Sequence, residues 1–247
     1  MKSLDFDRAA PVYYVACCPS TNGQLKELAG QGAAEGTVLI AGSQSEGRGR
    51  MGRSFASPEG GVYLSMLLKP PLNEKVPRLS VLAALAVRKA LLECCGVRAD
   101  IKWPNDLLLY GKKICGILAE SVIFGQELSV ILGIGVNLNT PGEAFPPELC
   151  EIAGSLYSLR GKKYDLQEFA HRLIYELDSM YSRWEKGESF AEEYRTACIN
   201  LGRQVTLLRR EEKICAKAVD IADDMSLVVI MPDGREEKIR FGEVSLR

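Results

Sequence analysis

The sequence has no apolar run that approaches the roughly 18 residues of a membrane-spanning segment. Its start, MKSLDFDRAAP, carries Asp5 and Asp7 where a secretory signal would need an apolar core. It also has no excess of charge of either sign, because 31 Lys and Arg residues face 32 Asp and Glu residues. We therefore expect a cytoplasmic protein that binds no membrane and has no chain-wide basic field for nucleic acid.

Histidine is almost absent, and His171 is the only one. It falls on the polar side of an expected helix, so we expect it at the surface, and a histidine-based catalytic triad elsewhere is excluded. The eight cysteines include no Cys-x-x-Cys pair, so zinc-knuckle and thioredoxin-like sites both lack their spacing. We expect these cysteines to be reduced and mostly buried, and no metal ligands can be named from the sequence.

The remaining composition is that of a globular protein, with 47% apolar and 26% charged residues. A length of 247 residues corresponds to one or two domains at roughly 150 residues each. Helix and strand patterns mix up to Gly202, and only short strands follow it. We therefore expect a larger domain over residues 1–200 and a small all-β domain over residues 201–247.

Turn residues and apolar periodicity predict the individual elements. In the first half they predict strands at 13–17, 37–41 and 62–68, a helix from Ser20-Thr21-Asn22 to Gly30, and a helix at 79–92. Antiparallel hairpins follow, with strands at 101–103, 107–110, 114–121 and 128–136. Asp165 and Glu168 resemble a capping box at the start of a helix that reaches Trp184, and another helix is expected at 190–201.

The expected C-terminal strands are 205–208, 214–219, 227–231 and 238–241, with a tight turn at Pro232-Asp233-Gly234. The fold class is therefore α+β, with a mixed, largely antiparallel sheet flanked by helices and a small β domain at the C-terminus.

The first segment that could carry chemistry is Gly-Arg-Gly-Arg-Met-Gly-Arg at residues 47–53. It matches the dinucleotide fingerprint G-x-G-x-x-G, but the residues after it, through Pro58, cannot begin the helix that a Rossmann site requires. Glycines allow close approach of a ligand, and guanidinium groups bind oxyanions in a bidentate manner. An exposed basic turn is the alternative interpretation.

Two further segments are rich in cations, amides and glycines. The first is Lys102-Trp103-Pro104-Asn105-Asp106, followed by Lys112, Lys113 and Gly116, for which a solvated hairpin is the alternative. The second is Gly-Ile-Gly-Val-Asn-Leu-Asn at residues 133–139, with two glycines where backbone must come close and two amides at a strand end.

Together these segments resemble the biotin protein ligases, which activate biotin with ATP and transfer it to a lysine of a carrier protein. The resemblance spans Ser20 to Asn139 and rests on Gly-Arg-Gly-Arg-x-Gly-Arg and Lys-Trp-Pro-Asn-Asp-Leu. It implies the biotin and lipoate ligase fold, with an SH3-like barrel at the C-terminus. Because only about 12 residues precede the first expected strand, it implies a short form without an N-terminal DNA-binding domain.

The resemblance also implies roles for individual residues. For biotin it implies Ser20, Thr21, Asn22, Gln44, Gly47, Arg48, Gly49, Arg50, Lys113 and Gly116. For ATP it implies Arg50, Arg53, Phe55, Lys102, Asn105 and Asn137. For catalysis it implies Arg50 at the α-phosphate, Lys113 at the reacting carboxylate, and Asp106 at the acceptor amine, with capping of the hairpin turn as the alternative for Asp106.

Phe55 departs from the tryptophan that is common at its position, which leaves less area for stacking on adenine. The implied cofactors are biotin, ATP and Mg²⁺, and the implied partner is a biotin carboxyl carrier protein or domain, with no DNA; homodimer formation is left open. The rival interpretation is a lipoate or octanoyl ligase, whose pocket would not need to bind a ureido ring.

Overall fold

The computed structural model describes residues 1–71, 76, 79–209, 212–240 and 242–246. A large sheet has eight strands in the order β1-β2-β3-β4-β8-β7-β6-β5. Their bounds are β1 Lys2–Leu4, β2 Val12–Cys18, β3 Val38–Gln44, β4 Val62–Leu68, β5 Asp100–Lys102, β6 Asp106–Leu109, β7 Lys112–Phe124 and β8 Glu127–Val136. All neighbours pair antiparallel except β2 and β3, which confirms the mixed, largely antiparallel sheet.

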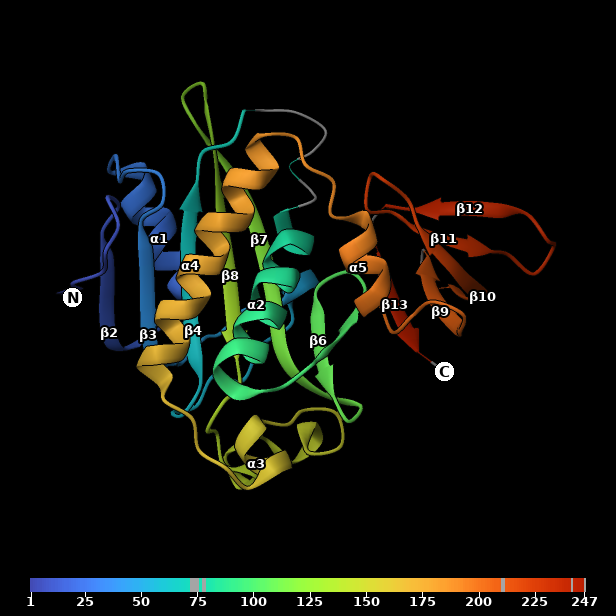
Figure 1. The fold of residues 1–247 in the computed structure, drawn as a ribbon, viewed down its shortest axis with the longest axis horizontal. Coiled ribbons are helices and arrows are strands. Elements are labelled where there is room, and N and C mark those ends of the chain that lie inside the picture. Colours follow the sequence, from blue (N-terminus) through green and yellow to red (C-terminus); the bar gives the residue numbers. More distant parts are fainter. Residues whose placement is uncertain (72–75, 77–78, 210–211, 241, 247) are drawn as a thin grey trace.

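Helices cover both faces of this sheet (Figure 1). One face carries α1, Thr21–Gly30, which connects β2 to the parallel β3 and buries Leu25 and Ala29 against Leu39, Leu67 and Ile131. The other face carries α2, Leu79–Cys95, and α4, Leu166–Glu185, which pack against each other. The shorter helices are α3, Leu156–Arg160, and α5, Ala191–Ala197.

Two predicted helix starts are confirmed by their caps. The Ser20 side chain accepts a hydrogen bond from the Gly23 N–H, and the Asp165 carboxylate accepts from the N–H groups of Gln167 and Glu168. The cap at Ser20 fixes the start of α1 at the end of β2, which places the next two residues, Thr21 and Asn22, over the sheet.

The C-terminal part is a five-stranded antiparallel sheet in the order β12-β11-β10-β9-β13. The strands are β9 Gln204–Arg209, β10 Glu212–Ile221, β11 Leu227–Ile230, β12 Glu236–Ile239 and β13 Glu243–Leu246. This sheet is anchored to the larger part by the Trp103 indole N–H, which donates to the Met225 carbonyl at 3.0 Å, and by Arg195, which donates to Asp220 and to the Ile221 carbonyl.

Some expectations about the elements were wrong. The first strand begins at Lys2 rather than after about 12 residues, and β13 was missed. Both are short strands that are defined by pairing with a neighbour: β1 pairs with β2, and β13 pairs with β9. The periodicity of a single sequence does not reveal such pairing. Helix α5 covers only Ala191–Ala197 of the predicted 190–201. Phe241, predicted to end a strand, lies outside the described residues.

All eight cysteines are free thiols, but the expected burial is wrong for half of them. Cys18, Cys95, Cys115 and Cys198 are buried, whereas Cys17 and Cys150 are exposed and the other two are intermediate. His171 is exposed, as predicted, and stacks on Phe6 with ring centroids 3.7 Å apart. None of the described helices is both long and apolar enough to cross a membrane.

Candidate functional site

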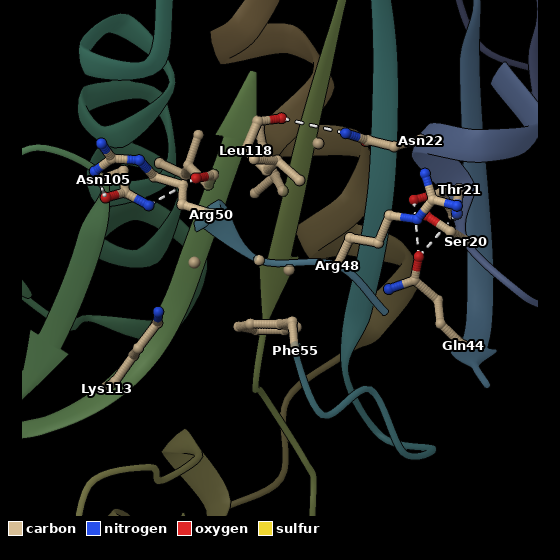
Figure 2. A pocket seen from close by; sticks show the side chains of 16 residues that line it. Ser20, Thr21, Asn22, Gln44, Arg48, Arg50, Phe55, Asn105, Lys113 and Leu118 are labelled. Atoms are coloured by element: carbon tan, nitrogen blue, oxygen red, sulfur yellow. Dashed lines mark hydrogen bonds between the residues drawn. The ribbon is translucent and has the colours of Figure 1, made fainter. Parts of the chain in front are cut away.

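The three segments singled out in the sequence meet in one pocket on the α1 face of the large sheet (Figure 2). One wall is the start of α1 and the end of β3, the opposite wall is the β6–β7 hairpin, and the arginine-rich loop crosses between them. The lining residues are Ser20, Thr21, Asn22, Gln44, Arg48, Gly49, Arg50, Phe55, Asn105, Lys113, Gly116, Ile117, Leu118, Gly133, Ile134 and Gly135.

One end of the pocket is polar and uncharged. The Gln44 carboxamide oxygen accepts from the Thr21 backbone N–H at 2.8 Å, and its NH₂ group donates to Ser57 Oγ at 2.8 Å. Ser57 Oγ in turn donates to the Phe55 carbonyl at 3.0 Å. These bonds join α1, β3 and the loop into one network, so the polar end is held in place from three segments.

Asn22 belongs to the same end and contacts two residues that the sequence interpretation missed. Its NH₂ group donates to a Glu120 carboxylate oxygen at 2.7 Å, and its oxygen accepts from Ser65 Oγ at 2.6 Å. Ser65 is fully buried in β4. It is the single polar residue of the strand sequence VYLSMLL, and that signal could have identified it.

Glycines form the floor of the pocket. Gly116 of β7 lies opposite Gly135 of β8, and a Cβ atom at Gly116 would lie 2.8 Å from the Phe55 ring. A Cβ atom at Gly135 would overlap the same ring, and one at Gly133 would overlap the Asn22 side chain. The close approach predicted at Gly133 and Gly135 is therefore confirmed, with Asn22 and Phe55 as the groups that approach.

The arginine-rich loop also depends on a glycine at its start. Gly47 is buried, and a Cβ atom there would overlap the Phe55 carbonyl and lie 2.6 Å from Ser57 Oγ. The Gly49 N–H donates to the Arg53 carbonyl at 2.7 Å, and Met51 has a positive φ of 56°. Arg48 is exposed and reaches across the pocket mouth toward Thr21 and Gln44 (Figure 2).

The opposite end of the pocket carries the cations. The Arg50 guanidinium donates to the Asn105 carboxamide oxygen at 2.9 Å and to the carbonyl of Gly242, the residue before β13, at 3.1 Å. Lys113 Nζ lies 2.7 Å from an Asp106 carboxylate oxygen and 5.7 Å from the centroid of the Phe55 ring. Both cations are held by neutral or acidic groups of the protein, at a position where an anion could compete for them.

A second cavity of about 380 Å³ adjoins the pocket, and the two share Arg50, Asn105, Ile117 and Leu118. It lies between the large sheet and the C-terminal sheet. Its other walls include Trp103, Met225, Asp224 and Arg240, and Met51 of the loop. A volume within the range of ligand sites, next to the cation end, suits a second substrate.

The structure does not bring every predicted site residue to these cavities. Arg53, Lys102, Asp106 and Gly47 line neither, although Asp106 contacts Lys113, which does. Asn137 is buried, its NH₂ group donates to the Gly154 carbonyl at 3.1 Å, and its backbone carbonyl accepts from the Leu156 N–H. Asn137 thus fixes the segment before α3, and its contact with a nucleotide stays a prediction.

Phe55 lies in the first pocket, and its stacking on adenine stays a prediction. Its ring rests on the glycine floor of the first pocket, and it does not line the second cavity next to Trp103. The neighbouring Tyr63, whose hydroxyl donates to the Pro58 carbonyl at 2.6 Å, is buried, and burial raises the pKa of its hydroxyl above the usual range. Tyr63 therefore stays neutral and holds the end of the loop.

Metal ligands are not clustered in the part of the chain that the structure describes. No group of three or more His, Cys, Asp or Glu side chains there could hold a metal ion.

Comparisons with known proteins agree with this geometry. The model of the biotin/lipoate A/B protein ligase family matches residues 14–137, and that of the biotin protein ligase C-terminal domain matches residues 201–247. The chain is 32% identical over 239 residues to the biotin--[acetyl-CoA-carboxylase] ligase of Mycobacterium tuberculosis, a match that covers 93% of this chain and 86% of that protein.

It is also 46% identical over 149 residues to the bifunctional ligase/repressor BirA of Bacillus subtilis, which covers 59% of this chain and only 46% of that relative. Among solved structures, the biotin protein ligase of Aquifex aeolicus in complex with biotin and ATP matches with a TM-score of 0.84 at 32% identity, over 96% of this chain and 98% of that one.

Proposed function

Since this chain belongs to the biotin/lipoate A/B protein ligase family and, within it, to the biotin protein ligases, we propose that it activates biotin with ATP and transfers the biotinyl group to a protein lysine. The observation that carries the proposal is the pocket with two unlike ends. A neutral polar end suits a ureido ring, and a cationic end suits a carboxylate that reacts with a phosphate.

In the first step, a biotin carboxylate oxygen attacks the α-phosphorus of ATP. The new P–O bond gives biotinyl-AMP, and the bond to the leaving pyrophosphate breaks. Lys113 leaves Asp106 to contact the biotin carboxylate, and Arg50 leaves Asn105 to contact the α-phosphate. Both cations stabilise the negative charge that develops on the reacting oxygens. The nucleotide occupies the second cavity, which shares Arg50 and Asn105 with the pocket.

Mg²⁺ enters this scheme with the nucleotide, since it is usually held by substrate phosphates, one or two carboxylates and several waters. Of the predicted ATP residues, Arg50 and Asn105 line the second cavity, and Arg53, Lys102 and Asn137 are proposed on the resemblance alone. Phe55 is proposed as a wall of the biotin pocket, because its ring lies against Gly116 and Gly135.

In the second step, the neutral amine of the acceptor lysine attacks the acyl carbonyl of biotinyl-AMP, an amide bond forms, and the C–O bond to AMP breaks. The amine must lose protons to react. Asp106 is free to take one once Lys113 has moved to the ligand, because the ion pair of 2.7 Å that engages it is then broken. The acceptor is proposed to be a biotin carboxyl carrier domain. A cytoplasmic location stays a prediction, and the oligomeric state is not assigned.

Biotin-dependent exchange of labelled pyrophosphate into ATP tests the first step without a carrier protein. The expected result is exchange that requires biotin and Mg²⁺, is not supported by lipoate or octanoate, and is lost in Lys113→Ala. Exchange with lipoate and not with biotin would identify the protein as a lipoate ligase instead. No exchange with any of these acids would contradict the proposal.

A further inference from the structure

We propose that Glu120 is a positioning residue that sets the direction of the hydrogen bonds at the polar end of the pocket, and so makes that end specific for a ligand with ureido N–H groups. The inference rests on the proposed function and names a determinant of its substrate specificity. Glu120 lies two residues beyond Leu118 and four beyond Gly116 on β7, so all three share the pocket face of the strand.

Glu120 is partly buried, and within the described residues no cation lies within ion-pair distance of its carboxylate. Its partner is the NH₂ group of Asn22, at 2.7 Å. The same NH₂ group also faces the Leu118 carbonyl at 3.4 Å. A carboxylate and a carbonyl can only accept, so the Asn22 nitrogen must point to β7 and the Asn22 oxygen must point away from it.

This orientation decides the next two bonds. The Asn22 oxygen can only accept, and Ser65 Oγ lies 2.6 Å from it, so the single hydroxyl proton of Ser65 goes to Asn22. Ser65 Oγ also lies 2.8 Å from Thr21 Oγ1. With its own proton used, Ser65 can take part in that contact only as an acceptor. The proton between them comes from Thr21, whose hydroxyl has a second, longer acceptor in the Gln44 carboxamide oxygen at 3.1 Å. The resulting relay runs from Thr21 through Ser65 and Asn22 to Glu120.

The relay determines what the pocket offers to a ligand. Both protein partners of the Thr21 hydroxyl, Ser65 Oγ and the Gln44 oxygen, take its proton, so Thr21 Oγ1 presents lone pairs to a ligand. The Asn22 oxygen retains a second lone pair. These acceptors suit the N–H groups of a ureido ring. Ser20 Oγ accepts from the Gly23 N–H, which leaves its proton available for the ureido carbonyl. An acid without N–H groups would leave the acceptors unpaired, which costs affinity.

Three single variants separate this role from a general effect of charge or packing. Glu120→Leu removes the acceptor, Glu120→Gln retains an acceptor oxygen without the charge, and Glu127→Gln is the matched control. Glu127 starts β8 on the same hairpin, and its carboxylate pairs with Lys69 at 3.1 Å outside the pocket. Calorimetry with biotin gives each Kd, and thermal unfolding checks that each variant is folded.

We expect Glu120→Leu to raise the Kd for biotin about tenfold or more, since a hydrogen bond to a charged group is lost. Glu120→Gln should stay within about threefold of the unmodified protein, and Glu127→Gln should not change it. At saturating biotin, kcat for pyrophosphate exchange should change less than about twofold, because at roughly 3.3 Å per strand residue Glu120 lies far along β7 from Lys113. If Glu120→Leu does not fold, Glu120→Ala removes the same acceptor without added bulk.

Coupling with Ser65 tests the relay itself. Ser65→Ala alone should weaken biotin binding, and the double variant with Glu120→Leu should bind no more weakly than the worse single variant. Losses that multiply would overturn the relay, and so would equal losses in Glu120→Gln and Glu120→Leu. An unchanged Kd in Glu120→Leu would overturn the inference alone. Absence of biotin binding by the unmodified protein would overturn the proposed function as well.

Discussion

Replacement of Gly133 by alanine tests whether the glycine floor exists to make room for Asn22. Gly133 is central in the sheet, paired with Ser65 of β4 and Leu118 of β7, so its backbone cannot withdraw. The new Cβ atom would overlap the Asn22 oxygen and lie 2.8 Å from Asn22 Cγ. Asn22 must therefore leave its position and give up its bonds to Glu120 and Ser65.

The magnitude follows from those two bonds and from overpacking. A bond to a charged group contributes about 1.5–3 kcal/mol and a neutral one about 1 kcal/mol. Overpacking in a tight core costs about 1–3 kcal/mol when the neighbours cannot move. The overpacking cost and the cost of the lost hydrogen bonds do not add in full, because Asn22 relieves the steric clash by breaking those bonds. We expect Gly133→Ala to lower the free energy of unfolding by about 2–4 kcal/mol and to raise the Kd for biotin more than tenfold.

Urea unfolding and calorimetry with biotin measure the two effects. The control is Gly23→Ala in α1, where a Cβ atom would meet only Ser20 Cβ at 3.7 Å and where alanine should be neutral or stabilising. The double variant Gly133→Ala/Asn22→Ala removes the overlap, so it should regain stability without regaining biotin affinity. A Gly133→Ala protein as stable as the unmodified one, with an unchanged Kd, would refute the reasoning.

Four further predictions follow from the same contacts. Arg50→Ala should lower biotin-dependent pyrophosphate exchange by about 10²–10³-fold, the cost of one lost transition-state donor, with an intact fold by circular dichroism; exchange at the normal rate would exclude Arg50 from the phosphate site. Asp106→Asn should slow transfer from biotinyl-AMP to a protein lysine about 10²–10⁴-fold but leave transfer to hydroxylamine, a largely neutral amine at pH 7, nearly unchanged; equal losses with both amines would contradict a proton-accepting role. Trp103→Phe removes the bond to the Met225 carbonyl and should lower the free energy of unfolding by about 1 kcal/mol in urea titrations, whereas unchanged stability would mean that this bond does not anchor the C-terminal sheet. At pH 8 a thiol reagent should label the exposed Cys17 and Cys150 quickly and spare the buried Cys95 and Cys198. Burial raises the pKa of Cys95 to about 12 and that of Cys198 to about 11, so both stay unreactive thiols until the protein unfolds. Fast labelling of all four cysteines would contradict the described burial.

The sequence predicted the parts of the fold that local chemistry determines. Ser20 and Asp165 cap helices because their side chains accept from N–H groups two or three residues ahead, and that relation is local. The four strands from β5 to β8 follow from turn residues between apolar runs. Short strands such as β1 and β13 depend on a distant partner, so their own residues do not reveal them.

The candidate site shows the same division. The loop and hairpin motifs lie around one pocket, as the resemblance implied, but Glu120 was missed because its role depends on Asn22, which is 98 residues away in sequence. The resemblance implied a contact of Phe55 with adenine, which stays a prediction, but it did not reveal that the Phe55 ring lies over Gly116 and Gly135. Contacts of that kind come from the register of β7 against β8, which no single motif encodes.

The intact mass of a purified biotin carboxyl carrier domain tests the central claim most directly. The domain is incubated with this protein, biotin and Mg-ATP, and with lipoate in place of biotin in a parallel sample. The account predicts a gain of one biotinyl group on one lysine, dependent on ATP and absent with Lys113→Ala. A gain with lipoate alone, or no gain while an established biotin ligase modifies the same carrier, would contradict it.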